Sequence, residues 1–137
     1  MSESFKDLTN KVLELYLPFE NDTEPDIPEL IIEFKNPQTA VIKRNTKNEK
    51  GIVVRNIYLS DNNNDYKRLL EKIKYIIKDI IDKEKLVPDY DDGIMIIDVC
   101  LDDDCIGAEV FEDEITKVLY TLIDDVVMDY NNILENT

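Results

Sequence analysis

The sequence predicts an α+β fold: an N-terminal helix, a three-stranded antiparallel meander, a long helix, a β-hairpin and a long C-terminal helix. Two observations carry this prediction. Long segments repeat apolar residues at helical spacing, and shorter segments alternate apolar with polar residues between turn-forming residues. The length of 137 residues predicts a single domain, 1–137, whose core needs neither a metal nor a disulfide for support.

The first element is expected to be a helix. Ser4 with Asp7 three residues later resembles a capping box, and Pro18 is expected to end the helix. Between them, apolar residues recur at helical spacing: Phe5, Leu8, Val12, Leu15 and Tyr16. The segment is therefore predicted to be a helix and not a strand of the sheet.

The middle of the chain predicts three strands and a helix. Alternation and turn residues place the strands at 30–35, 39–44 and 52–59. Ser60 and Asp61 are N-cap candidates for a helix that runs to about Lys85. Its basic face holds Lys67, Arg68, Lys74 and Lys78. We interpret that face as solvated surface, because the net acidic chain disfavours nucleic acid.

The last third predicts a hairpin followed by a helix. Strands at 94–101 and 105–111 are expected to flank an Asp103-Asp104 turn. Pairing Asp102 with Cys105 gathers the apolar side chains on one face: Met95, Ile97, Val99, Leu101, Ile106, Ala108 and Val110. It also places Asp98 opposite Glu109 on the other face. The final helix is expected from about residues 112–114 to Leu134, with an unusually wide apolar face.

Charge is distributed along the chain as acid, base and acid. From Asp89 to Thr137 there are fifteen acidic residues and one basic residue, Lys117. Lys35 to Lys85 carries net +6, and Met1 to Phe34 carries net −7. Like charges gathered in this way repel one another in the folded chain, and binding of a cationic partner would offset that repulsion.

The residue content argues against most catalytic chemistry. The chain has no His, which removes the commonest general base and transition-metal ligand. Its three glycines are too scattered for a phosphate-binding loop. Cys100 and Cys105 lie among carboxylates that should raise a thiol pKa, so they are expected to be unreactive reduced thiols. An EF-hand frame starting at Asp102 places Ile106 at a ligand position, so no calcium site or other cofactor is expected.

These observations predict a non-enzymatic protein that binds and inhibits a basic partner. In size, charge and cysteine poverty the chain resembles the small acidic α+β immunity proteins of bacterial toxin systems, although no shared motif carries the resemblance. The expected partner is a basic toxin, such as a nuclease, or a nucleic-acid-binding protein. The expected partner-binding residues are Asp98, Asp102, Asp103, Asp104, Glu109, Asp124, Asp125, Asp129 and Tyr90.

Two alternatives remain open at the level of sequence. The wide apolar faces of the last two helices could form a homodimer in an assembly or regulatory subunit. The carboxylates could instead mimic nucleic-acid phosphates and block a DNA-binding or defence protein. In each case a cytoplasmic location without membrane insertion is expected, because no apolar stretch approaches about 18 residues.

Overall fold

The computed structural model describes residues 7–17, 27–46, 48–60, 66–83, 94–111 and 114–135. They form six strands and two helices in the order β1 (Val12–Tyr16), β2 (Leu30–Asn36), β3 (Thr39–Arg44), β4 (Ile52–Tyr58), α1 (Tyr66–Lys83), β5 (Ile94–Leu101), β6 (Asp104–Phe111) and α2 (Ile115–Glu135). The α+β class is confirmed, but the predicted arrangement of its elements is wrong.

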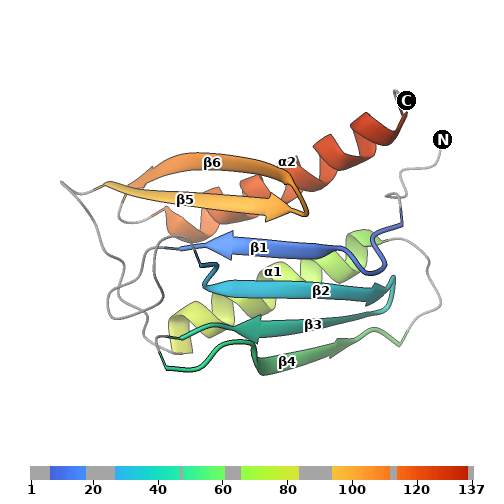
Figure 1. The fold of residues 1–137 in the computed structure, drawn as a ribbon, viewed down its shortest axis with the longest axis horizontal. Coiled ribbons are helices and arrows are strands. Elements are labelled where there is room, and N and C mark those ends of the chain that lie inside the picture. The colour runs from blue at the N-terminus through green and yellow to red at the C-terminus, as the bar shows by residue number, and fades with distance from the viewer. Residues whose placement is uncertain are drawn as a thin grey trace.

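The architecture is one antiparallel sheet with both helices on the same face. The strand order is β4-β3-β2-β1-β5-β6, so the predicted meander and the hairpin are two parts of one sheet. Figure 1 shows α1 behind the β1 to β4 part of the sheet and α2 behind the β5 to β6 part. Helix α2 contacts both β5 and β6, and the Tyr66 ring of α1 meets the Phe34 ring of β2 edge to face.

The predicted N-terminal helix is wrong over the described part of that segment. Val12–Tyr16 is strand β1, which pairs with β2 on one side and with β5 on the other. Leu13 and Leu15 are fully buried and alternate with half-buried neighbours, which is the period of a strand. Asn10, with a φ of 69°, adopts a left-handed conformation that a continuous right-handed helix does not allow.

The core lies between the helices and the sheet face that they cover. Alternate residues of β1 and β2 point into it, as do the apolar stripes of both helices. The fully or almost fully buried members include Leu13, Leu15, Leu30, Ile32, Phe34, Leu69, Ile73, Ile77, Val99, Leu119, Ile123 and Val126. Each such side chain contributes roughly 1.5–3 kcal/mol by leaving water. This burial accounts for the wide apolar face of α2 in the described residues, because the sheet covers it.

Several segment predictions agree with the observed elements. Strands β2, β3 and β4 occupy the expected ranges, with shifts in register near residues 34–36 and 42–43. Helices α1 and α2 also fall within the expected ranges. The errors were the type of the first element and the assembly of the sheet. Strand β1, predicted as helix, joins the two halves of the sheet.

The strand order places stretches of opposite net charge at opposite ends of the sheet. The net basic stretch from Lys35 to Lys85 supplies β3, β4 and α1 at one end of the sheet. The net acidic stretch from Asp89 to Thr137 supplies β5, β6 and α2 at the other end. The two ends of the sheet therefore come from stretches of opposite net charge.

Candidate functional site

The hairpin of β5 and β6 has the predicted faces but a different register. Leu101 pairs with Asp104, so the turn is formed by the preceding pair Asp102-Asp103 and the predicted Asp103-Asp104 turn is wrong. Asp102 has a φ of 53°, a left-handed conformation that Asp tolerates better than most residues. The hydrophobic pattern is preserved because a shift of two residues leaves every side chain on its original face.

The register changes which residues lie opposite the hairpin carboxylates. Asp98 pairs with Gly107, and Glu109 pairs with Ile96, so the predicted direct pairing of Asp98 with Glu109 is wrong. A side chain on Gly107 would collide with the Asp98 carboxylate. The Asp98 carboxylate therefore lies across the space that glycine leaves, and the two acidic side chains are diagonal instead of directly opposed.

Two large apolar side chains accompany these carboxylates on the sheet face away from the helices. Ile96 is 61% exposed and Phe111 is 59% exposed. Strand alternation puts them on the same side of the hairpin as Asp98 and Glu109. We call these four residues the outer hairpin face. Exposed apolar side chains flanked by carboxylates are typical of a surface that meets another molecule.

Glu14 extends this acidic surface onto the central strand. It pairs with Ile31 of β2 and with Cys100 of β5, and it lies on the outer side of the sheet. Partial burial raises the pKa of Glu14, and the nearby Asp102 charge raises it further. Sequence reasoning missed this residue because it assigned the segment to a helix. The alternation of Leu13, Leu15 and Leu17 with polar neighbours was the available signal.

The carboxylates at the hairpin tip have different surroundings. Asp102 forms an ion pair with Lys11, 3.1 Å between Nζ and Oδ2, and this contact raises the pKa of Lys11. Lys11 also lies 5.6 Å from the centre of the Tyr130 ring. Asp103 is exposed. Asp104 is half-buried, and its Oδ2 has no hydrogen-bond partner among the residues described.

The helix carboxylates lie in a different layer from the hairpin carboxylates. Asp124 binds the buried Lys74 of α1, whereas Asp125 and Asp129 are exposed on α2. Helix α2 covers one face of the sheet, and the outer hairpin face is on the other. The structure therefore does not bring these two groups into one surface. Tyr90, the remaining expected contact residue, lies outside the described residues.

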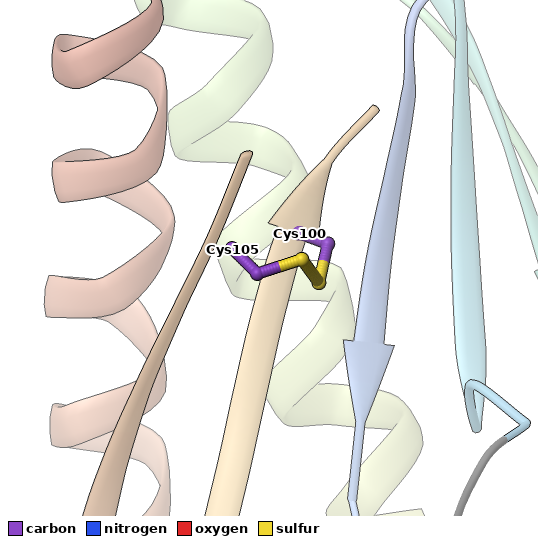
Figure 2. The surroundings of a disulfide bond; sticks show 2 residues. All are labelled: Cys100 and Cys105. Atoms are coloured by element: carbon purple, nitrogen blue, oxygen red, sulfur yellow. A yellow bond between two sulfur atoms is a disulfide. The ribbon is translucent and has the colours of Figure 1, made fainter. Parts of the chain in front are cut away.

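Cys100 and Cys105 form a disulfide, so the expectation of two reduced thiols is wrong. They are directly paired across β5 and β6, with Cα atoms 4.0 Å apart, a short distance typical of a non-hydrogen-bonded pair. Figure 2 shows the bond crossing the hairpin on the side away from α1. The disulfide thus lies on the outer side of the sheet, beside Glu14 and two residues along β5 from Asp98.

The described residues offer no other obvious chemical centre. Within the part of the chain that the structure describes, no cluster of three His, Cys, Asp or Glu residues is placed to hold a metal ion. No described helix combines the length and apolar character needed to cross a bilayer.

Comparisons with protein-family models, curated proteins and solved structures returned no match for this chain. The functional proposal therefore depends on surface chemistry alone.

Proposed function

We propose that this chain is a non-enzymatic binding protein that inhibits a basic protein partner through its outer hairpin face. The observation that carries the proposal is the exposure of Ile96 and Phe111 beside Asp98 and Glu109. Interfaces combine an apolar centre, which excludes water, with a polar rim that selects the partner. On this surface the rim is acidic, so the complementary partner is basic.

The overall charge supports rapid association with such a partner. The chain carries net −15, and its most acidic stretch contains the hairpin. Complementary fields of this kind steer encounter and raise association rates, with an effect that falls as salt increases. A small inhibitor of an intoxicating enzyme benefits from speed, which favours an immunity protein that neutralises a basic toxin such as a nuclease.

The layout of the carboxylates favours a compact plug over a nucleic-acid mimic. Glu14, Asp98 and Glu109 come from three neighbouring strands, and Asp98 and Glu109 lie beside the exposed Ile96. A mimic of a phosphate backbone needs charges strung along an extended ridge, and it gains nothing from an apolar centre. We therefore rank inhibition of an active site above blocking by mimicry.

The assembly alternative loses its original support. It was motivated by the wide apolar faces of the last two helices. Both faces are buried inside the fold, through Leu69, Ile73 and Ile77 of α1 and Leu119, Ile123 and Val126 of α2. Strand β6 lies at the end of the sheet, with α2 on its inner face. A self-associating version of this protein could use the β6 edge or the outer hairpin face, and the second of these is the surface already assigned to the partner.

The sequence predicted a cytoplasmic location, but the Cys100–Cys105 disulfide argues against it. Disulfides persist mainly in oxidising compartments, and cytosolic thiol systems keep most cysteines reduced. The Cys100–Cys105 bond is therefore an argument for an oxidising environment.

The proposal is tested by capture from an extract of the native host, with the full chain as bait. Ile96→Ser and Phe111→Ser remove the apolar centre, and Asp98→Asn with Glu109→Gln removes the acidic rim. We expect a basic protein to be captured by the wild type and lost with the first pair. The second pair should slow its association and weaken the salt dependence. The purified partner should then lose its own activity when one equivalent of this chain is added.

Met128→Ser is the matched control, because Met128 is also a large exposed apolar residue but lies on α2. It should capture the same partner as the wild type. Capture that survives all the hairpin substitutions, or that fails equally with the control, would contradict the proposal. So would a captured partner whose activity is unchanged by the bound chain.

A further inference from the structure

The basic end of the molecule contains a hollow that the sequence pattern did not indicate. It lies between the end of β4 and the exposed side of α1, and its volume is about 660 Å³. The lining residues are Tyr58, Leu59, Ser60, Lys67, Arg68, Glu71, Lys72 and Tyr75. This volume falls within the range of roughly 300–1,000 Å³ in which small-molecule sites occur. The strand order puts the hollow at the opposite end of the sheet from the outer hairpin face.

The lining is positively charged even though the protein is strongly acidic. Lys67, Arg68 and Lys72 face a single lining carboxylate, Glu71. That carboxylate already binds a cation outside the hollow, with its Oε1 3.1 Å from Nζ of Lys74. The Lys72 ammonium donates a hydrogen bond to the Tyr58 carbonyl oxygen at 3.4 Å, so it is tied to another residue of the lining. Among the described residues, the lining thus holds three cations and one carboxylate, a composition suited to an anion.

Other cations on the same helix lie outside the hollow. Lys74 binds Asp124 of α2, and Lys78 binds Asp82 one turn further along α1. The first pair links the two helices, and the second lies within α1. The cations that line the hollow occupy a different side of α1, beside the end of β4.

Two aromatic rings complete the hollow. Tyr58 of β4 is 69% exposed and Tyr75 of α1 is 72% exposed, although tyrosine rings gain from being covered. The two residues are far apart in sequence, so only the fold brings them to one site. Exposed aromatic rings beside cations are the combination that recognises a planar ring carrying a phosphate.

We propose that this hollow binds a mononucleotide, with the base against a tyrosine ring and the phosphate at Arg68 and Lys72. Arg68 and Lys72 are four residues apart on one helix face, so both can reach one phosphate group. A glycine-rich loop binds phosphate through backbone N–H groups, and this sequence has no such loop. At this site the side chains of Arg68 and Lys72 would make the phosphate contacts instead. The inference extends beyond the proposed function, because it concerns a second ligand at the other end of the protein.

The charge distribution favours a single nucleotide over a nucleic-acid strand. A long polyanion would extend beyond the hollow and meet a protein of net charge −15. A mononucleotide responds mainly to charges within a Debye length, about 8 Å at physiological salt. Within that distance it meets the basic lining of the hollow.

The experiment is calorimetric titration of the full chain with AMP, adenosine, inorganic phosphate and a short single-stranded oligonucleotide. We expect AMP to bind at least about tenfold more tightly than adenosine or phosphate, because only AMP uses both halves of the site. Tyr75→Ala should weaken AMP binding by about tenfold and leave phosphate binding unchanged. Arg68→Gln with Lys72→Gln should weaken both.

Lys78→Gln with Lys83→Gln is the matched control, because it removes the same charge from α1 outside the hollow. It should bind AMP like the wild type. Equal affinity for AMP and phosphate would overturn the proposal, as would an equal loss in the control. Tighter binding of the oligonucleotide than of AMP would also overturn it and assign the hollow to a nucleic-acid surface.

Discussion

Lys74 of α1 and Asp124 of α2 are joined by an ion pair in which the lysine Nζ lies 3.0 and 3.1 Å from the two carboxylate oxygens. Lys74 is only 7% exposed, and Glu71 is its second partner. Burial lowers the pKa of Lys74, but the hydrogen bonds with Asp124 and Glu71 outweigh it and the pKa is raised overall. Asp124, which the sequence grouped with partner-binding carboxylates, therefore has a role in linking the two helices.

Replacing Asp124 with Asn should destabilise the protein by about 1–2 kcal/mol. A hydrogen bond to a charged group contributes roughly 1.5–3 kcal/mol, but Asp124 is half exposed and Glu71 remains to pair with Lys74. Urea unfolding at neutral pH measures the change. Asp125→Asn is the control, because Asp125 is exposed on the same helix, and it should stay within about 0.5 kcal/mol of the wild type. Equal losses would show that the ion pair does not stabilise the helix packing.

Strand β1 shows why the fold could be predicted only in part. Its five residues, Val12 to Tyr16, fit both a helical and an alternating pattern, because a short apolar run does not separate the two periods. Its assignment depends on pairing with β2 and β5, and β5 is distant in the sequence. The longer stripes of α1 and α2 were predictable because many turns of helix repeat the same signal.

In the hairpin, the sequence pattern predicts which face each side chain occupies but not the register of the two strands. Alternation placed Asp98 and Glu109 on the outer face, which the structure confirms. It could not distinguish registers that differ by two residues, because both bury the same side chains. The turn at Asp102-Asp103 decides the register, and its left-handed Asp102 is a backbone feature that periodicity does not reveal. Glu14 joined the surface only through the position of β1.

Gly107→Ala should move the Asp98 carboxylate with little effect on stability. The new methyl group would occupy the space in which that carboxylate lies, and it would also press on the carbonyl oxygen of Ile97. The flexible carboxylate can rotate away, and replacing a strand glycine itself gains about 0.5–1 kcal/mol. We therefore expect stability within about 1 kcal/mol of the wild type, together with a changed carboxyl carbon shift for Asp98 in NMR spectra.

The double substitution Gly107→Ala with Asp98→Ala isolates this contact. Without the Asp98 carboxylate, the methyl group meets only the tight approach to the Ile97 carbonyl. The thermodynamic cycle should give a coupling energy above about 0.5 kcal/mol. Additive effects of the two substitutions would show that Asp98 does not occupy the space above Gly107.

Replacing Cys100 and Cys105 with Ser should lower stability by about 2 kcal/mol while preserving the fold. The bond closes a loop between residues five apart in sequence, and the loop-entropy relation gives a small contribution for so short a loop. The hairpin keeps its inner apolar face, so far-UV circular dichroism should remain native. Dithiothreitol should destabilise the wild type to a similar extent and leave the double variant unchanged. An effect of the reductant on the variant would point to a cause other than this bond.

Glu14→Gln and Glu33→Gln should change stability in opposite directions at neutral pH, although both side chains lie on the outer side of the sheet. Burial raises the pKa of Glu14, so its ionisation opposes folding. Its contribution is most favourable below the ordinary glutamate pKa of about 4.3 and is lost as the pH rises through the raised folded-state value. Glu14→Gln should therefore stabilise the protein at pH 7, by about 0.5–1 kcal/mol, with no gain at low pH.

Glu33→Gln is expected to change stability in the opposite direction, because the neighbours of Glu33 are cations. The hydrogen bond from Lys43, together with Lys35, holds the pKa of Glu33 below its usual range. Its stabilising effect is present above about pH 4.3 and is lost as the pH falls through the lowered folded-state pKa. Glu33→Gln should therefore destabilise the protein at pH 7 by up to about 1 kcal/mol, the range of partly exposed ion pairs. Melting temperatures of both variants from pH 3 to pH 8 measure the two effects. Changes of the same sign at pH 7 would refute the account, because the two carboxylates would then respond to the net charge of the protein and not to their own neighbours.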